Sequence, residues 1–274
     1  MSKQHAKTIF FLFLLGLAIP TWAWAGILGE SYLSICRSAL LRDRWMEDVS
    51  LPKGVHWVTD PGELPAVSDG LAEAYSDHPL FSWIVPNPSL RPNLWYTLVR
   101  QAYLNGGILT ADSPGTASAL WFENKKGSAG LLTLLLTGQV FLAPRVGIGN
   151  TVNAFRLDGF LTKTRRRLIA EAGNGDGALY LFQVGVKQAA RNQGLASQII
   201  RPVLDYADHT RRIVVLEVHK EDNIPVYQKM GFSVGHEEIF PRMAPKRGVS
   251  TGHEEISPRM VPMSRVMVRE PNDR

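Results

Sequence analysis

The segment 178–232 limits the fold of this chain more than any other stretch, because strands and helices alternate in it. Leu179–Val186 is an apolar run rich in Leu, Phe and Val, typical of a strand buried on both faces. A polar loop follows, and then apolar residues recur on one helical face, namely Leu195, Ile199, Ile200, Val203, Leu204 and Ala207. Residues 212–218 form a second apolar run. We therefore predict the order strand, helix, strand.

The turn that enters this predicted helix contains Gly194 and is suited to binding an anion. The first amides of a helix have no acceptor within it and lie at the positive end of the helix dipole. A glycine tolerates positive φ and lets an anion approach the backbone, and Arg191 would add charge. Neither GxxxxGK[ST] nor GxGxxG occurs in this turn, and many strand–glycine–helix turns only close a fold. The turn alone is equally compatible with a structural role.

A short helix is predicted after the second strand, with Pro225 in its first turn and Gly231 beyond its end. Asn223 and Tyr227 would then lie one turn apart on the same face of that helix. Two polar side chains would therefore point the same way, close to the end of the second strand.

Two motifs in this segment resemble those of the GNAT superfamily of N-acyltransferases. The pattern R-x-x-G-x-A at 191–196 resembles the acetyl-CoA signature [R/Q]-x-x-G-x-[G/A], and N-x-x-V-Y-x-x-x-G-F at 223–232 resembles the superfamily's later motif. A predicted strand separates the two at the usual distance. The close resemblance covers 179–234, and a looser one begins near Val55.

The resemblance implies an α/β (α+β) fold of GNAT type. Such a fold has a mixed, mostly antiparallel twisted sheet with two splayed parallel central strands and flanking helices. Here the splayed strands would be Leu179–Val186 and 212–218. In this superfamily the pantetheine arm of the cosubstrate lies in the gap between these strands. The active site is therefore expected where the two strands separate.

The resemblance also implies acetyl-CoA as cosubstrate. Backbone groups of Val184 and Val186 would pair with the pantetheine arm, and an amide near Gly185 would polarise the thioester carbonyl. Asn223 would hydrogen bond to the arm, and Arg191 would lie beside the pyrophosphate. The amides facing the pyrophosphate would be those of Gln193, Gly194, Leu195 and Ala196.

The superfamily's later motif assigns Tyr227 as the general acid that protonates the departing thiolate. The alternative for Tyr227 is a core aromatic whose hydroxyl is satisfied. Glu217, at the end of the second strand, is the best candidate for the general base, and His219 is the second because its pKa suits the task. A surface ion pair of Glu217 with Arg211 or Lys220 is an equal alternative, and water-relayed deprotonation would need neither base.

The rest of residues 55–274 is predicted to complete this GNAT-like domain. Candidate strands lie at 55–59, 108–111, 119–124 and 265–269, and candidate helices at 64–75 and 94–103. A helical insertion is expected at about 125–177, packing on one face of the sheet, with a lid over the acyl or acceptor pocket as the functional alternative. The run Arg165-Arg-Arg within it is expected to be a solvated helix face.

The N-terminus has the pattern of a targeting segment. Two lysines precede an apolar run and an Ala-Trp-Ala cleavage pattern, so we interpret residues 1–25 as a signal peptide or N-terminal anchor and 26–54 as a linker. The first interpretation implies a secreted or periplasmic protein, and an anchor implies membrane association through residues 9–28. If the start is misassigned and the functional chain begins near Met46, the protein is expected to be cytoplasmic.

Charge and composition narrow the class of partner. The net charge of +5 suits a polyanionic cosubstrate and does not indicate nucleic acid.

A segment beginning Gly-His-Glu-Glu-Ile occurs twice, which predicts a duplicated loop at 235–262. The segment lacks HExxH and the spacing of metal ligands, so no metal site is predicted.

The acceptor is expected to be a primary amine on a small molecule or peptide. The alternative from another class is a catalytically silent acyl-CoA-binding or partner-binding module. The sequence does not indicate an oligomeric state.

Overall fold

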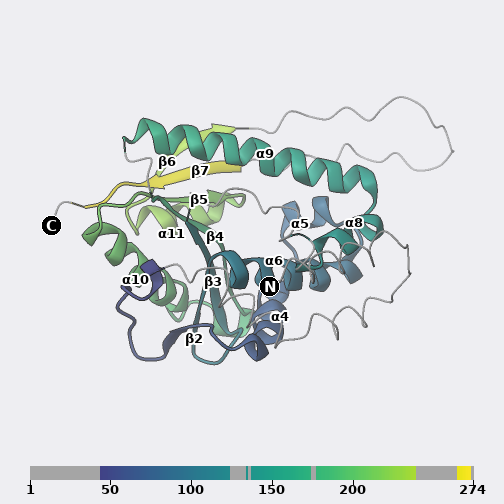
Figure 1. The fold of residues 1–274 in the computed structure, drawn as a ribbon, viewed down its shortest axis with the longest axis horizontal. Helices are drawn as coiled ribbons and strands as arrows, with labels where there is room; N and C mark the ends of the chain where they lie inside the picture. The colour runs from purple at the N-terminus through teal and green to yellow at the C-terminus, as the bar shows by residue number, and fades with distance from the viewer. Residues whose placement is uncertain (1–43, 124–133, 135–136, 174–176, 239–263, 273–274) are drawn as a thin grey trace, which may run out of the picture.

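The fold was analysed in a computed structural model, which describes residues 44–123, 134, 137–173, 177–238 and 264–272 (Figure 1). One sheet of seven strands organises the described part of the chain, in the order β1-β2-β3-β4-β5-β7-β6. The strands are β1 (Val55–Trp57), β2 (Gly107–Ala111), β3 (Ala117–Glu123), β4 (Leu179–Val186), β5 (Val214–Val218), β6 (Ser233–Glu238) and β7 (Ser264–Arg269). All neighbouring pairs are antiparallel except β4 with β5, which are parallel.

The parallel pair separates part-way along its length. The register of β4 with β5 runs from Leu179 beside Val214 to Leu181 beside Leu216 and then stops. Beyond this point β4 stays paired with β3 as far as Val186. A register shift between β3 and β4 lies at the same level, and a bulge of this kind bends the strand. The gap predicted between two splayed central strands is therefore confirmed.

One face of the sheet is covered by α10 (Leu195–His209), α11 (Ile224–Gln228) and the segment that precedes β1. The apolar stripe of α10 predicted from the sequence is buried, with Ile199 and Val203 fully inaccessible. Trp45 and Met46, which fall within the predicted 26–54 extension, are 3% and 5% exposed and pack into this same core. The core on this face holds α10 rigidly against the strands that frame the gap.

The other face carries α4 (Leu64–Ala74), α5 (Pro79–Ile84), α6 (Arg91–Asn105) and α9 (Ile148–Glu171), with α8 (Gln139–Val146) beside them (Figure 1). Helices α4 and α6 bury their apolar sides against β2 and β3. The C-terminal half of α9 packs Leu168 and Ile169 onto β5 and β7. The helices between β3 and β4 thus extend the sheet's cover toward β6 and β7.

The fold class agrees with the prediction, and the differences from it are local. The sequence predicts no helix between the candidates at 64–75 and 94–103. Proline can end a helix but also fits the first position of a new one, and Pro79 begins α5. None of the helices in the described ranges is both long and apolar enough to span a bilayer. The predicted targeting segment 1–25 lies outside the described residues. So does the duplicated loop beyond Glu238.

Candidate active site

The gap between β4 and β5 opens into a cavity of about 130 Å³. Its walls come from β4, the first turns of α10, and α11: they are Val184, Val186, Ala196, Ile200, Asn223, Val226 and Tyr227. Five of these seven residues belong to the site predicted from the sequence, and they come from three separate elements. The fold therefore brings the two sequence motifs together on one side of the splayed strands.

Gly194 opens α10 in the left-handed conformation, with φ of 80°. The first hydrogen bond of the helix runs from the Gln198 amide to the Gly194 carbonyl at 3.0 Å, so the amides of residues 195–197 have no acceptor within the helix. A Cβ added to Gly194 would meet no atom within 4 Å, so the space in front of the turn is open. This is the geometry that an anion needs to reach the exposed amides.

Arg191 lies at the predicted turn, but its side chain is directed toward the neighbouring backbone. Its Nε donates to the Val186 carbonyl at 3.3 Å, and its Nη2 donates to the Ala74 carbonyl at 3.1 Å. The amide of Gln188 also donates to Glu73 in α4, at 3.0 Å. The loop before α10 is thus fastened to the C-terminal end of α4, and Arg191 stays exposed at the edge of the turn.

Tyr227 and Asn223 meet the cavity from α11, one turn apart as the sequence predicted. Asn223 is exposed, whereas Tyr227 is half-buried and packs beside Phe232 and the core of the α10 face. Burial raises the pKa of Tyr227 to about 12, so the hydroxyl is protonated at neutral pH. Within the described part of the chain, no other group forms a hydrogen bond with that hydroxyl. It is therefore free to donate into the cavity.

Glu217 points to the opposite face of the sheet from Tyr227, toward α9. Its side chain is 8% exposed and forms an ion pair with Arg165, which is 9% exposed. The other carboxylate oxygen accepts a hydrogen bond from the Tyr180 hydroxyl at 3.0 Å, and the Arg165 guanidinium lies 4.1 Å from the centre of the Tyr180 ring. The prediction that the arginines at 165–167 form a solvated helix face is therefore wrong for Arg165, which is buried, whereas Arg166 and Arg167 are exposed.

The sequence-based alternative, a surface ion pair of Glu217, named the wrong partners. Lys220 pairs instead with Asp77 at 3.6 Å, and the partner of Glu217 comes from α9, 52 residues away in the sequence. A single sequence carries no sign of so distant a contact. The carboxylate is thus held on the α9 side by a buried cation and a phenol.

His219 follows β5 at the end that borders the gap. Its Nδ1 lies 2.9 Å from the Ser264 hydroxyl, and its ring makes an edge contact with the His78 ring at 5.9 Å between centroids. Burial lowers the pKa of both imidazoles, that of His78 to about 3, and Glu217 opposes the shift at His219. Both rings are therefore neutral at pH 7. No sequence motif singles out His78, which is a lone histidine beside a proline.

Tyr75, at the end of α4, reaches the gap from the other face of the sheet. Its hydroxyl donates to the Val184 carbonyl at 2.8 Å and accepts from the Val184 amide at 3.3 Å. Gly185 makes this approach feasible, since a Cβ there would lie 2.7 Å from Leu71 and 3.0 Å from Ala74. The backbone groups of Val184 that the prediction left for a ligand are thus bonded to a side chain. No motif in the sequence pointed to Tyr75.

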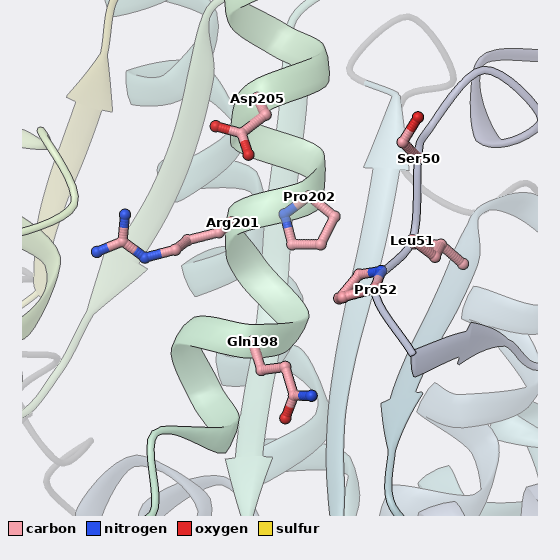
Figure 2. A pocket seen from close by; sticks show the side chains of 7 residues that line it. All are labelled: Ser50, Leu51, Pro52, Gln198, Arg201, Pro202 and Asp205. Carbon is pink, nitrogen blue, oxygen red and sulfur yellow. The ribbon is translucent and has the colours of Figure 1, made fainter. Parts of the chain in front are cut away.

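A larger cavity of about 400 Å³ lies elsewhere, between α10 and the segment before β1 (Figure 2). It is lined by Ser50, Leu51, Pro52, Gln198, Arg201, Pro202 and Asp205. Figure 2 shows that Pro202 faces this segment, whereas the Arg201 guanidinium points away from it. None of the predicted site residues lines this cavity. In the described ranges there is also no cluster of three or more histidine, cysteine or acidic side chains able to hold a metal ion.

Comparison with known proteins agrees with this arrangement. The model of a family described as the acetyltransferase (GNAT) family matches residues 161–232, which contain β4, α10, β5 and α11. This match covers the part of the chain that carries both sequence motifs. The strand β4, the glycine turn of α10 and the tyrosine of α11 all lie within it.

Solved structures similar to this chain include two insect enzymes. The arylalkylamine N-acetyltransferase 2 of Aedes aegypti gives a TM-score of 0.52 at 14% identity, covering 80% of this chain and 100% of that one. The polyamine N-acetyltransferase of Drosophila melanogaster gives a TM-score of 0.49 at 13% identity, covering 79% and 98%. At such identity the first likeness shows the fold alone.

A curated relative of this chain is a probable serine/threonine-protein kinase of Dictyostelium discoideum. It is 25% identical over 201 residues, which are 65% of this chain and 21% of that protein. The chain thus spans about a fifth of the length of that relative.

Proposed function

We propose that this protein transfers the acetyl group of acetyl-CoA to a primary amine by direct attack within a ternary complex. The observation that carries the proposal is the cavity at the splayed strands, which joins β4, the first turns of α10 and Tyr227 of α11. Each of these three parts would fit one region of a long, charged thioester.

The turn at Gly194 would hold the diphosphate. Its free amides and the helix dipole supply positive potential without any buried cation, and the open space in front of the turn admits the anion. Arg191 would add charge from the edge of the turn, where its guanidinium is exposed. Backbone groups of Val184, Gly185 and Val186 would face the arm in the gap, and Asn223 would hydrogen bond to it from α11.

The acyl transfer itself forms a C–N bond and breaks a C–S bond. The amine nitrogen attacks the thioester carbonyl, a backbone amide near Gly185 stabilises the oxyanion, and the thiolate leaves. Tyr227 would protonate that thiolate, because its hydroxyl is protonated, borders the cavity and has no hydrogen-bond partner among the described residues. Once the ammonium proton has been removed, the attacking nitrogen loses a second proton as the amide forms, and this second proton would restore the Tyr227 hydroxyl by way of solvent.

We assign removal of the ammonium proton to His219 in preference to Glu217. Both carboxylate oxygens of Glu217 are already bonded on the α9 side, to Arg165 and Tyr180, so they are directed away from the cavity. His219 is neutral, sits at the end of β5 beside the gap, and has its ring fixed through Ser264. A neutral imidazole can accept the proton at physiological pH.

The experiment that tests this function is thiol release from acetyl-CoA by the full chain with a panel of primary amines and peptides. Wild-type protein is expected to release thiol with at least one amine. Tyr227→Phe is expected to lower kcat by about 10²-fold or more, the usual contribution of a positioned acid. Thermal melting of both proteins checks that the variant is folded.

Two results would overturn the proposal in different ways. Tight CoA binding with no thiol release from any amine would support the silent acyl-CoA-binding module. Release of thiol by Tyr227→Phe at the wild-type rate would remove that hydroxyl from the mechanism, leaving transfer itself intact.

A further inference from the structure

Tyr75 occupies a position that belongs to the ligand in the proposed function. The parallel register of β4 with β5 ends at Leu181, so the edge of β4 beyond it faces the gap. Val184 lies on this free edge, and both of its backbone groups that point into the gap bond to the Tyr75 hydroxyl, at 2.8 and 3.3 Å. A single hydroxyl thus replaces the neighbouring strand at this level.

The hydroxyl is held there by its surroundings. The Tyr75 ring packs against Trp95 at 4.7 Å and Phe81 at 5.3 Å between centroids, both nearly inaccessible. Gly185 leaves just enough room for α4 to lie on the strand, since a Cβ there would lie 2.7 Å from Leu71. Burial raises the pKa of Tyr75 well above its ordinary value, and proximity to Tyr227 raises it further, so the group remains a hydrogen-bond donor.

These two hydrogen bonds satisfy the amide and the carbonyl of Val184, which would otherwise be buried without partners at the edge of β4. Unpaired backbone groups in a half-buried gap cost free energy, and a strand-like ligand arm would satisfy the same two groups. The arm and the Tyr75 hydroxyl therefore compete for the same amide and carbonyl of Val184.

We propose that the Tyr75 hydroxyl is a placeholder for the thioester arm and thereby sets the affinity of the site for CoA. The inference rests on the proposed function. When the arm enters the gap, the hydroxyl leaves Val184, and the loss of its two hydrogen bonds subtracts from the binding free energy. Tyr75→Phe removes this competition, so the variant binds CoA more tightly than the wild-type protein does.

Calorimetric titration of the full chain with CoA tests the proposal. Two net hydrogen bonds correspond to roughly a tenfold change in the dissociation constant, so Tyr75→Phe is expected to bind CoA about tenfold more tightly. Adenosine 3′,5′-bisphosphate carries phosphates and no arm, and its affinity should be the same for both proteins. Tyr103→Phe is the matched control: that hydroxyl donates to the Thr59 carbonyl at 2.9 Å, in the same core and away from the gap.

Thermal melting gives a second, independent readout. Without ligand, Tyr75→Phe is expected to melt below the wild-type protein, and saturating CoA should remove that difference. Equal or weaker CoA binding by Tyr75→Phe, or a melting difference that persists in saturating CoA, would mean that the hydroxyl stays on Val184 in the complex and would overturn the inference. Absence of CoA binding by the wild-type protein would instead overturn the proposed function, and this inference with it.

Discussion

Replacing Glu217 by glutamine separates a structural role of this carboxylate from a catalytic one. The ion pair with Arg165 is buried on both sides, at 8% and 9% exposure, so the substitution leaves a guanidinium inside the protein without its counter-charge. Removing one partner of a buried pair costs about 3–5 kcal/mol. We expect the low end, about 3 kcal/mol, because Thr162 and the Tyr180 ring still contact Arg165.

The assay is urea unfolding of the single and double variants, combined with thiol-release kinetics. Glu217→Gln should lower the free energy of unfolding by about 3 kcal/mol, and Arg165→Met with Glu217→Gln should recover more than half of that loss. Glu123→Gln is the matched control, because its pair with Arg212 at 3.1 Å is more exposed (17% and 24%) and should cost about 1 kcal/mol or less. The structural argument fails if Glu217→Gln unfolds like the wild-type protein and yet loses more than about 10²-fold in kcat/KM.

Three further predictions follow from other contacts. Asp208→Ala should cost about 3–5 kcal/mol in urea unfolding, because its bidentate pair with Arg269 is 5–7% exposed, and a cost below about 1 kcal/mol would count against that pair. Gly194→Val should raise the KM for acetyl-CoA by about tenfold or more through strain at positive φ. Gly138→Val, at a φ of 84° and equally open, should lose only stability, and equal KM values for the two variants would contradict the anion site. Because the native pKa of His78 is about 3, below its ordinary 6.5, the native state binds fewer protons between these values. Its stabilising contribution should thus be complete above pH 6.5 and decline as pH falls toward 3, by up to about 1.4 kcal/mol per pH unit, and His78→Gln should flatten that slope.

The sequence was sufficient for the elements whose signals are local. Leu179–Val186 reads as a strand from its apolar run, and Gly194 with the stripe that follows it marks the start of α10; both are found at those positions. The strand predicted at 212–218 begins at Val214, because strand ends depend on partners that the sequence does not specify. Helix α5 was missed because proline is compatible with either end of a helix.

Side chains that meet across the sheet were beyond reach of the sequence. Arg165 looked like part of a solvated arginine run, and its pairing with Glu217 depends on where α9 crosses β5. Tyr75 and His78 belong to no motif, yet α4 and α5 place them at the gap. Ala196, Asn223 and Tyr227 face the cavity and could be predicted because they lie within motifs. Val184 and Val186 could be predicted because the family resemblance assigns a role to the strand that carries them, whereas the residues that approach from α4, α5 and α9 could not.

The most direct test of the central claim is calorimetric titration of the full chain with CoA at two temperatures. The account predicts one site per chain, weakened by Gly194→Val, with a negative heat-capacity change as the arm displaces water from the cavity at Val186 and Tyr227. Heat that is absent at both temperatures, or binding that Gly194→Val leaves untouched, would contradict the claim that this turn and this gap form a thioester site.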